Sequence, residues 1–246
     1  MPPDEIYNKL SLIYNSVMNK VRYDRWSEYL LAVVEMYINE DADVLELAAG
    51  NCNFAEYFVQ YFPKLIVSDK SLKMLAASKI NNIPKVCCDM SRLPFKSKFD
   101  LIYSTFDSVN YLTSKKSLLN LFKEVKPILK DDGIFTFDVS LEKNSLLHIK
   151  EPVRKGSYKG ISFIHETSYN KKIRIHKNTF KIKLNNKIFI EVHRQKIYPF
   201  DLYFNIIESA GLYVVECMET FSFIKACEDS ERVQFIVKKV KSNVKH

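Results

Sequence analysis

The sequence predicts an α/β fold in which helices cover a mostly parallel, seven-stranded sheet that also carries an antiparallel β insert. Two observations lead to this prediction. Up to Val139, and again near the C-terminus, short apolar runs alternate with helical stretches, which is typical of βαβ units. Between these two parts, apolar residues recur with a period near two, which is typical of antiparallel strands.

The N-terminal part, residues 7–38, has a helical pattern because its apolar residues share one face of a 3.6-residue repeat: Trp26, Tyr29, Leu30, Val33 and Tyr37. Five short apolar runs then predict strands that are buried on both faces: Val44–Leu47, Leu65–Val67, Val86–Cys88, Leu101–Tyr103 and Ile134–Val139. Two further strands are predicted near the C-terminus, at Tyr213–Met218 and Arg232–Lys238. Helices are predicted between them at Phe54–Tyr61, Leu72–Lys79, Leu118–Leu129 and Asp201–Ala210.

The antiparallel insert follows from alternating apolar residues between Ile173 and Val192. Asn185 and Asn186 separate two of its runs and predict a hairpin turn. Four basic side chains are expected on the face opposite the apolar one: Arg174, His176, Lys181 and Lys183. We therefore predict one domain, residues 1–246, with three parts: an N-terminal helical segment (1–40), a core (41–142 and 199–240) and the insert (150–198).

The composition is that of a globular protein and excludes disordered, collagen-like and coiled-coil chains, with 47% hydrophobic, 13% aromatic and 27% charged residues. No run approaches the ~18 consecutive apolar residues of a transmembrane helix, and no apolar stretch follows the acidic start as in a secretory signal. The five cysteines form no C-x-x-C pair. This pattern predicts neither a disulfide framework nor a zinc site and favours the reducing cytoplasm.

Positive charge is concentrated in one segment. The net charge is +8, and the stretch from Lys143 to Tyr198 contains fourteen Lys and Arg residues against three Glu. If these cations line a pocket, they raise the local concentration of an anionic ligand. The alternative is a solvated surface that reflects a lysine-rich composition.

Acidic residues lie at three neighbouring strand regions that share one edge of the predicted sheet. The first, Glu46, is followed by Gly50, where small residues allow a ligand to approach the backbone and a helix N-terminus. Asp69 lies 19 residues after that glycine, a position that accepts the ribose hydroxyls of a nucleoside. Asp89 is placed to accept an adenine amino group, with Met90 against the ring. Each residue alone has a structural explanation, but together they predict a nucleoside site.

Five stretches resemble the class I S-adenosylmethionine-dependent methyltransferases, and in particular their small-molecule branch with an N-terminal aromatic helix pair. They are Tyr7–Trp26, the first motif Leu45–Gly50, Asp69, Asp89–Phe95 and Phe99–Leu112, of which Phe106–Leu112 is the most specific part. The resemblance covers residues 7–139 and 195–239. It implies a Rossmann-like three-layer sandwich, S-adenosyl-L-methionine as cofactor and S-adenosyl-L-homocysteine as product.

The resemblance also implies individual roles. Glu46 would bind the amino group of the methionine moiety, which would lie against the backbone at Ala48 and Gly50. Asp69 would hold the ribose and Asp89 the adenine amine. The other implied cofactor-binding residues are Lys70 and Met90 beside the ring, Thr105 and Phe106 at the methionine end, and Tyr14, Tyr23 and Trp26 as an aromatic lid over the sulfonium. Residues 1–40 would thus form a lid, and residues 150–198 would roof the acceptor site.

Two positions depart from the family pattern. Cys52 stands where the family usually has a third glycine, and Asn51 stands where Thr is common. A side chain at position 52 either crowds the methionine moiety or points away from it. A nicotinamide-dependent dehydrogenase also uses an acid after a glycine turn, but it would need more glycines there and would leave Asp89 and Phe106–Leu112 unexplained.

Methyl transfer from a sulfonium is an in-line displacement that needs positioning, exclusion of water and, for some acceptors, a base. Asp107, Asn110 and Tyr111 follow the fourth strand, where the acceptor would lie. We predict Asp107, Asn110 and His193 as catalytic residues and Tyr111 as a substrate contact. The sequence offers no carboxylate cluster from which to assemble a metal site, so no metal is predicted.

The resulting prediction is a cytoplasmic enzyme, a monomer or homodimer, that methylates an N or O atom of a small molecule. An anionic acceptor is predicted, with Arg174, His176, Lys181 and Lys183 as its contacts. One alternative is an RNA or protein methyltransferase that docks through the basic insert, although the insert lacks the aromatic platforms on which single-stranded RNA stacks. Another is a non-catalytic domain that retains the fold.

Overall fold

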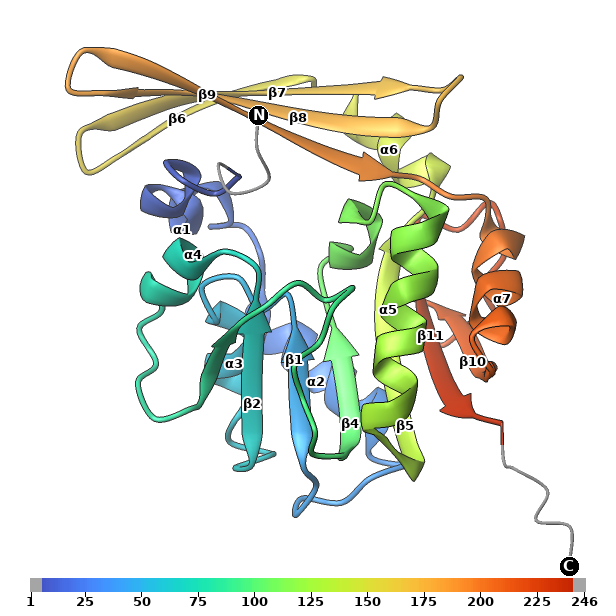
Figure 1. The fold of residues 1–246 in the computed structure, drawn as a ribbon. Coiled ribbons are helices and arrows are strands. Elements are labelled where there is room, and N and C mark those ends of the chain that lie inside the picture. Colours follow the sequence, from blue (N-terminus) through green and yellow to red (C-terminus); the bar gives the residue numbers. More distant parts are fainter. Residues whose placement is uncertain (1–5, 241–246) are drawn as a thin grey trace, which may run out of the picture.

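The structure of the protein, a computed structural model, describes residues 6–240 and contains two separate sheets (Figure 1). The larger sheet has seven strands in the order β10-β11-β5-β4-β1-β2-β3, and all its pairings are parallel except those of β11. Its strands are β1 (Val44–Leu47), β2 (Leu65–Asp69), β3 (Lys85–Cys87), β4 (Phe99–Ser104), β5 (Leu129–Ser140), β10 (Leu212–Glu219) and β11 (Arg232–Lys239). The predicted α/β fold with a mostly parallel, seven-stranded sheet is confirmed.

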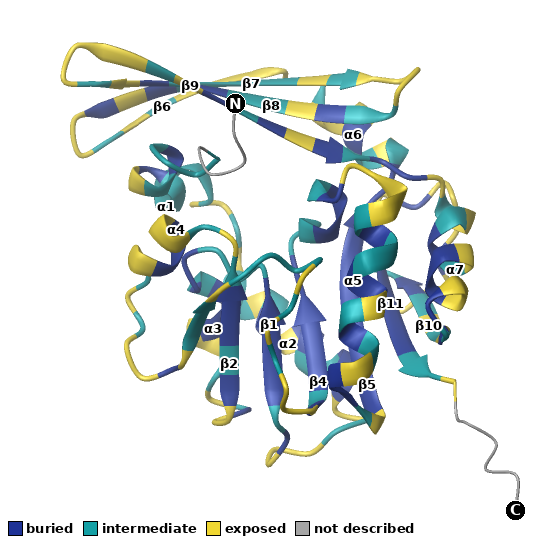
Figure 2. Ribbon diagram, in the orientation of Figure 1, coloured by how far each residue is buried: buried dark blue, intermediate teal, exposed yellow. Residues whose placement is uncertain are grey.

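Helices cover both faces of this sheet because successive strand side chains point to opposite sides. On β4, Ile102 packs with α5 (Lys115–Ile128) and α7 (Phe200–Ser209), whereas Leu101 and Tyr103 pack with α2 (Tyr23–Val34) and α3 (Asn53–Phe58). The strands β1, β2, β4, β5 and β11 are largely buried, whereas β3 and β10, at the two edges of the sheet, are partly exposed (Figure 2). The result is a three-layer sandwich in which α4 (Leu72–Ala76) follows β2.

The smaller sheet is the predicted antiparallel insert. It consists of β6 (Val153–Tyr158), β7 (Ile161–Asn170), β8 (Ile175–Leu184) and β9 (Lys187–Lys196), paired in sequence order. Asn185 and Asn186 form the turn between β8 and β9, both with positive φ (48° and 60°), which matches the two-residue turn that a hairpin favours. The helix α6 (Glu142–His148) joins the two sheets, and the insert lies across the end of the larger sheet where its parallel strands finish (Figure 1).

The N-terminal segment is less regular than its helical pattern predicts. It forms a short 3-10 helix, η2 (Leu10–Leu12), and a single helical turn, α1 (Tyr14–Val17), before α2 begins. The reason is that its apolar residues belong to two different cores. Leu10 and Ile13 pack against Phe163 and Phe180 of the insert, whereas α2 packs on the larger sheet.

Among the described residues, none of the helices has both the length and the apolar character needed to cross a membrane.

Candidate active site

A cavity of about 870 Å³ lies between the two sheets. We call its two walls the floor and the roof. The floor is formed where the parallel strands end, by Glu46, Gly50, Asp69, Asp89 and Phe106 among others. The roof is formed by α6 and by the face of the insert turned toward the larger sheet, and its lining residues are Asn144, Ser145, His148, Arg154, His165, Thr167, His176, Asn178, Phe180 and Gln195.

Most of the residues predicted from the sequence line this cavity. Those on the floor and the N-terminal segment are Tyr14, Tyr23, Trp26, Glu46, Ala48, Gly50, Asp69, Lys70, Asp89, Met90, Thr105, Phe106, Asp107 and Tyr111, and His176 is on the roof. Five predicted residues do not line it: Asn110, Arg174, Lys181, Lys183 and His193.

The turn after β1 alternates between ordinary and left-handed backbone. Ala48, Gly50 and Cys52 have φ of 57°, 59° and 62°. A Cβ on Gly50 would lie 3.3 Å from Met74 Cε, so a side chain there would also be tightly packed. Cys52 is 1% exposed and packs in the core with Phe54 rather than lining the cavity. Its side chain therefore points away from the cavity and does not crowd it.

Asp69 is fixed by two backbone amides at the end of β2. Its Oδ2 accepts a hydrogen bond from the Gly50 N–H and its Oδ1 accepts one from the Ser71 N–H, both at 2.7 Å. Burial raises the pKa of Asp69, while the two amides act in the opposite direction. The carboxylate is thereby oriented at the floor by the same turn that follows β1.

Glu46 is a buried carboxyl on β1, with 1% of its surface exposed. The Tyr103 hydroxyl donates to its Oε2 at 3.1 Å. Burial raises the pKa of Glu46 to about 8, and the negative charge of Asp69 adds to this effect. A cation entering the floor would stabilise the ionised form, so this group is suited to bind an ammonium.

Asp89 lies at the far end of the floor beside Lys70. The Lys70 Nζ donates to its Oδ2 at 2.7 Å, and Ser91 donates to its Oδ1 through both its N–H and its hydroxyl. Burial opposes ionisation, but these contacts outweigh it and lower the pKa of Asp89. Asp89 is therefore a charged acceptor next to Met90.

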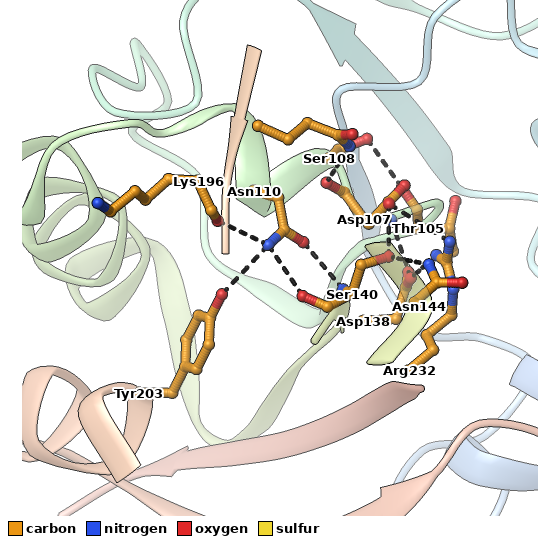
Figure 3. A network of polar contacts seen from close by, with 11 residues as sticks. Thr105, Asp107, Ser108, Asn110, Asp138, Ser140, Asn144, Lys196, Tyr203 and Arg232 are labelled. Atoms are coloured by element: carbon orange, nitrogen blue, oxygen red, sulfur yellow. Dashed lines mark hydrogen bonds and ion pairs between the residues drawn. The ribbon is translucent and has the colours of Figure 1, made fainter. Parts of the chain in front are cut away.

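The loop after β4 is held by a buried ionic network (Figure 3). Asp107 donates its N–H to Asp138 Oδ2 at 2.8 Å, and its carboxylate accepts from the Ser140 hydroxyl at 2.7 Å. Arg232 forms ion pairs with both Asp107 and Asp138. Burial raises the pKa of Asp138 to about 6, while Arg232 acts to lower it. The network fixes Asp107 in a left-handed conformation (φ 49°) that costs a non-glycine residue about 1–2 kcal/mol.

Asn110 has a framework role instead of a place in the cavity. It is wholly buried, and its side-chain amide donates to the carbonyl oxygens of Ser140 (3.2 Å) and Lys196 (2.9 Å), while its Oδ1 accepts from the Ser140 N–H (Figure 3). Its side chain thus connects β5 to β9. With its hydrogen-bonding groups engaged in this way, Asn110 is placed to support the site rather than to contact reactants.

His193 is also buried outside the cavity. Its ring lies 4.6 Å from that of Tyr7 and 5.4 Å from that of Phe180, centroid to centroid. Its Nε2 is 3.6 Å from Glu191 Oε2. Glu191 in turn accepts hydrogen bonds from the backbone N–H groups of Lys9 and Leu10. This pair therefore holds the N-terminal segment against the insert.

The N-terminal segment also contacts the floor, through Asn15 and Tyr7, two residues to which the sequence prediction gave no individual role. Asn15 Oδ1 accepts hydrogen bonds from the side-chain amides of Asn51 and Asn53, at 2.7 and 2.9 Å. The Tyr7 hydroxyl donates to the Tyr111 hydroxyl at 2.9 Å. Asn51, which departs from the family pattern, is thus a contact point for this segment.

Three of the four predicted contacts of an anionic acceptor lie away from the cavity, which corrects the sequence prediction. Strand β8 turns His176, Phe180 and Ile182 inward, so Lys181 and Lys183, with odd numbers, face outward. Lys181 pairs with Glu166 at 2.7 Å on that outer face. Arg174 precedes the strand and donates to the Ile197 carbonyl oxygen. The sequence-based assignment failed because the apolar residues before Lys177 have odd numbers and those after it have even numbers. The basic residues opposite them therefore lie on different faces of the strand.

The roof is rich in histidine. His148, His165 and His176 all line it, and burial is the main cause that lowers the pKa of each. The imidazole Nε2 of His165 is 2.8 Å from Asn178 Oδ1, and the rings of His148 and His176 are 6.0 Å apart. These side chains are neutral hydrogen-bonding groups at neutral pH.

Comparisons with known proteins agree with this geometry. A family model described as "Methyltransferase domain" matches residues 44–133, the part that contains β1 to β4. The Bacillus subtilis (strain 168) protein named "Putative methyltransferase YqeM" is 25% identical over 253 residues, covering 97% of this chain and 99% of its own length.

Solved structures share the fold. An S-adenosylmethionine-dependent methyltransferase from Clostridium acetobutylicum ATCC 824 superposes with a TM-score of 0.79 at 24% identity, covering 96% of this chain and 99% of its own. The sugar N-methyltransferase KedS8 from Streptoalloteichus sp. ATCC 53650 does so with a TM-score of 0.75 at 16% identity, covering 94% and 92%.

The fold, the acidic floor and these similarities together support one class of protein, the class I S-adenosylmethionine-dependent methyltransferases. Its cofactor is accordingly S-adenosyl-L-methionine. The floor fits this molecule chemically, because Glu46, Asp69 and Asp89 offer carboxyl groups to an ammonium, two hydroxyls and an amine, and aromatic rings, which can stabilise a sulfonium, line the same cavity.

Proposed function

We propose that this methyltransferase acts on an N or O atom of a small molecule that occupies the cavity between Asp107 and the roof. The observation that carries the proposal is the continuity of the cavity: one space of about 870 Å³ includes both the acidic floor and the histidine-lined roof. A cavity of this size accommodates a cofactor and a small acceptor together. The fold shared with the sugar N-methyltransferase KedS8 also supports a small-molecule acceptor.

Each acidic residue of the floor binds a different part of the cofactor. Glu46 binds the ammonium of the methionine moiety, Asp69 binds the ribose hydroxyls, and Asp89 binds the adenine amine. The turn at Ala48 and Gly50 allows the ligand to approach the backbone. Tyr14, Tyr23 and Trp26 cover the cofactor from the N-terminal side, and they and Lys70, Met90, Thr105 and Phe106 complete its surroundings.

When bound, S-adenosyl-L-methionine supplies an activated methyl group: the acceptor lone pair forms a bond to its carbon while the carbon–sulfur electron pair remains on sulfur. Asp107 is positioned by Ser140 and Arg232 at the end of the floor nearest the roof, where it accepts the proton that the acceptor loses. The neutral histidines of the roof orient the acceptor. Tyr111, hydrogen-bonded to Tyr7, closes the cavity and excludes water.

The test begins with cofactor binding. Asp69→Ala is expected to weaken binding of S-adenosylhomocysteine by about 1.5–3 kcal/mol, since it removes hydrogen bonds to a charged group. The control is Asp41→Ala, because the Asp41 side chain is 92% exposed. Calorimetry on both variants and on the parent chain measures the difference, and equal affinities would remove Asp69 from the site.

Methyl transfer is then measured with labelled cofactor and a panel of small amines and alcohols, with a transcribed RNA and a protein mixture as competing substrates. Labelled small-molecule product that is lost in Asp107→Ala, together with unchanged binding of S-adenosylhomocysteine, is the expected result. Label that enters only RNA or protein would contradict the proposal.

A further inference from the structure

The roof contains one permanent cation. Of the residues that form it, Arg154 is the one Arg or Lys, and among the described residues it forms no ion pair with an acid. By contrast, Arg232 also lines the cavity but is neutralised by Asp107 and Asp138. Arg154 is exposed to solvent, so its guanidinium is free to bind an anionic group that enters the cavity.

The side chains beside Arg154 in the roof are polar and carry no negative charge. Arg154 on β6 lies opposite His165 on β7 in the strand register. His165 contacts Asn178 at 2.8 Å and Thr167 at 3.3 Å, and all three line the same wall. The positive charge of Arg154 adds to burial in lowering the pKa of both His148 and His165, so the guanidinium acts on both imidazoles across the roof.

Asp107 places a carboxylate in the same cavity as the Arg154 guanidinium. Its negative charge acts on His148 and His176 in the opposite sense to burial, which shows that these rings also lie within its field. Asp107 and Arg154 therefore act on the pKa of His148 in opposite senses. The acceptor part of the cavity has a carboxylate near the floor and a guanidinium in the roof.

We propose that the roof contains an anion subsite: the acceptor carries a carboxylate or phosphate group that Arg154 binds, while its amine or hydroxyl lies at Asp107. The inference rests on the proposed function and adds the class of acceptor. It also moves the predicted anion contact from Arg174, Lys181 and Lys183 to a residue that lines the cavity. Arg binds both oxyanions through two parallel hydrogen bonds.

The chain offers a matched control in the next residue. Lys155 lies on the same strand, and its side chain points to the opposite face because successive strand side chains alternate. Arg154→Gln and Lys155→Gln therefore remove the same charge from adjacent positions, the first from the cavity and the second from the outer surface. Both positions are exposed, so neither substitution disturbs the core.

The experiment uses the full chain saturated with S-adenosylhomocysteine. Inorganic phosphate and, separately, acetate are titrated at constant ionic strength, and binding is followed through the imidazole NMR signals of His148, His165 and His176. The parent chain and Lys155→Gln are expected to show the same saturable shifts, and Arg154→Gln is expected to bind about tenfold more weakly. The probe that binds more tightly identifies the acceptor group as phosphate or carboxylate.

Two results would overturn the subsite: no saturable shift of these histidines in the parent chain, or equal affinities of Arg154→Gln and the parent. Failure of the proposed function is distinguishable, because it would appear as absent binding of S-adenosylhomocysteine before any anion is added. All three chains are expected to bind S-adenosylhomocysteine equally.

Discussion

Glu46 couples pH to the stability of the unliganded protein. Its pKa is raised to about 8 in the folded chain, mainly by burial, against about 4.3 for an exposed glutamate. Between these values the folded chain holds the extra proton, so the free energy of unfolding decreases as the pH rises. We expect Glu46→Gln to lose this decrease in urea unfolding at pH 6 and pH 8. Glu56→Gln, at an exposed helical position, is expected to retain it.

The same carboxyl makes cofactor binding dependent on pH. An ammonium placed beside Glu46 lowers its pKa, so binding of S-adenosylhomocysteine near pH 7 releases a proton and strengthens as the pH rises toward 8. Calorimetry in two buffers of different ionisation enthalpy counts this proton. Glu46→Gln is expected to bind more weakly and to release none. Proton uptake by the parent chain would contradict the assignment of Glu46.

Gly50 combines a left-handed backbone with close packing. Gly50→Ala is expected to destabilise the protein by about 1–2 kcal/mol and to weaken binding of S-adenosylhomocysteine, because its new methyl group would press on Met74. Gly160→Ala is the control, since Gly160 also has positive φ (79°) but no atom lies within 4 Å of the added Cβ. Chemical unfolding should show a loss in both variants, and calorimetry a loss of affinity only in the first.

Among the elements, the N-terminal segment depends most on a few contacts. Glu191→Gln weakens the charged acceptor for the Lys9 and Leu10 N–H groups. We expect faster hydrogen exchange over residues 9–17, with unchanged exchange in β1 and β4, and weaker binding of S-adenosylhomocysteine. Glu166→Gln, which alters a pair on the outer face of the insert, serves as control. Unchanged exchange in the segment would show that Tyr7 and Asn15 hold it without Glu191.

An element can be predicted from the sequence when local residues determine it, and not when it depends on contacts between residues far apart in the chain. The central strands were predictable because their residues are mostly apolar: Val44–Leu47 matches β1 as observed. The split of the N-terminal helix was not, because it results from Leu10 packing on Phe163, far along the chain. Arg154 and Asn15 carry no local signal, since their roles arise only when the insert and the segment meet the floor.

For the whole molecule, the position of the lysine and arginine side chains distinguishes methylation of a small molecule from binding of RNA. Lys177, Lys183 and Arg194 are exposed on the outer face of the insert, away from the cavity. A triple variant with Gln at these positions is expected to bind S-adenosylhomocysteine and to methylate small acceptors as the parent does. Filter binding at 50 and 200 mM salt tests the nucleic-acid alternative, in which the parent would lose about 10³–10⁵-fold in RNA affinity and the variant would bind RNA poorly.

The hydrogen bonds of Asn110 affect which parts of the sequence can change during evolution. One side-chain amide holds Ser140, where the chain leaves the larger sheet, and Lys196, just before it returns to α7. The chain between these two anchored points can therefore lengthen, shorten or change its sequence while the β4 loop keeps its geometry. Descendants of this fold could exchange substrates by replacing the segment between these two points, as long as the new segment keeps a group that, like Glu191, holds the N-terminal segment in place. Selection would then act on the two parts at different rates.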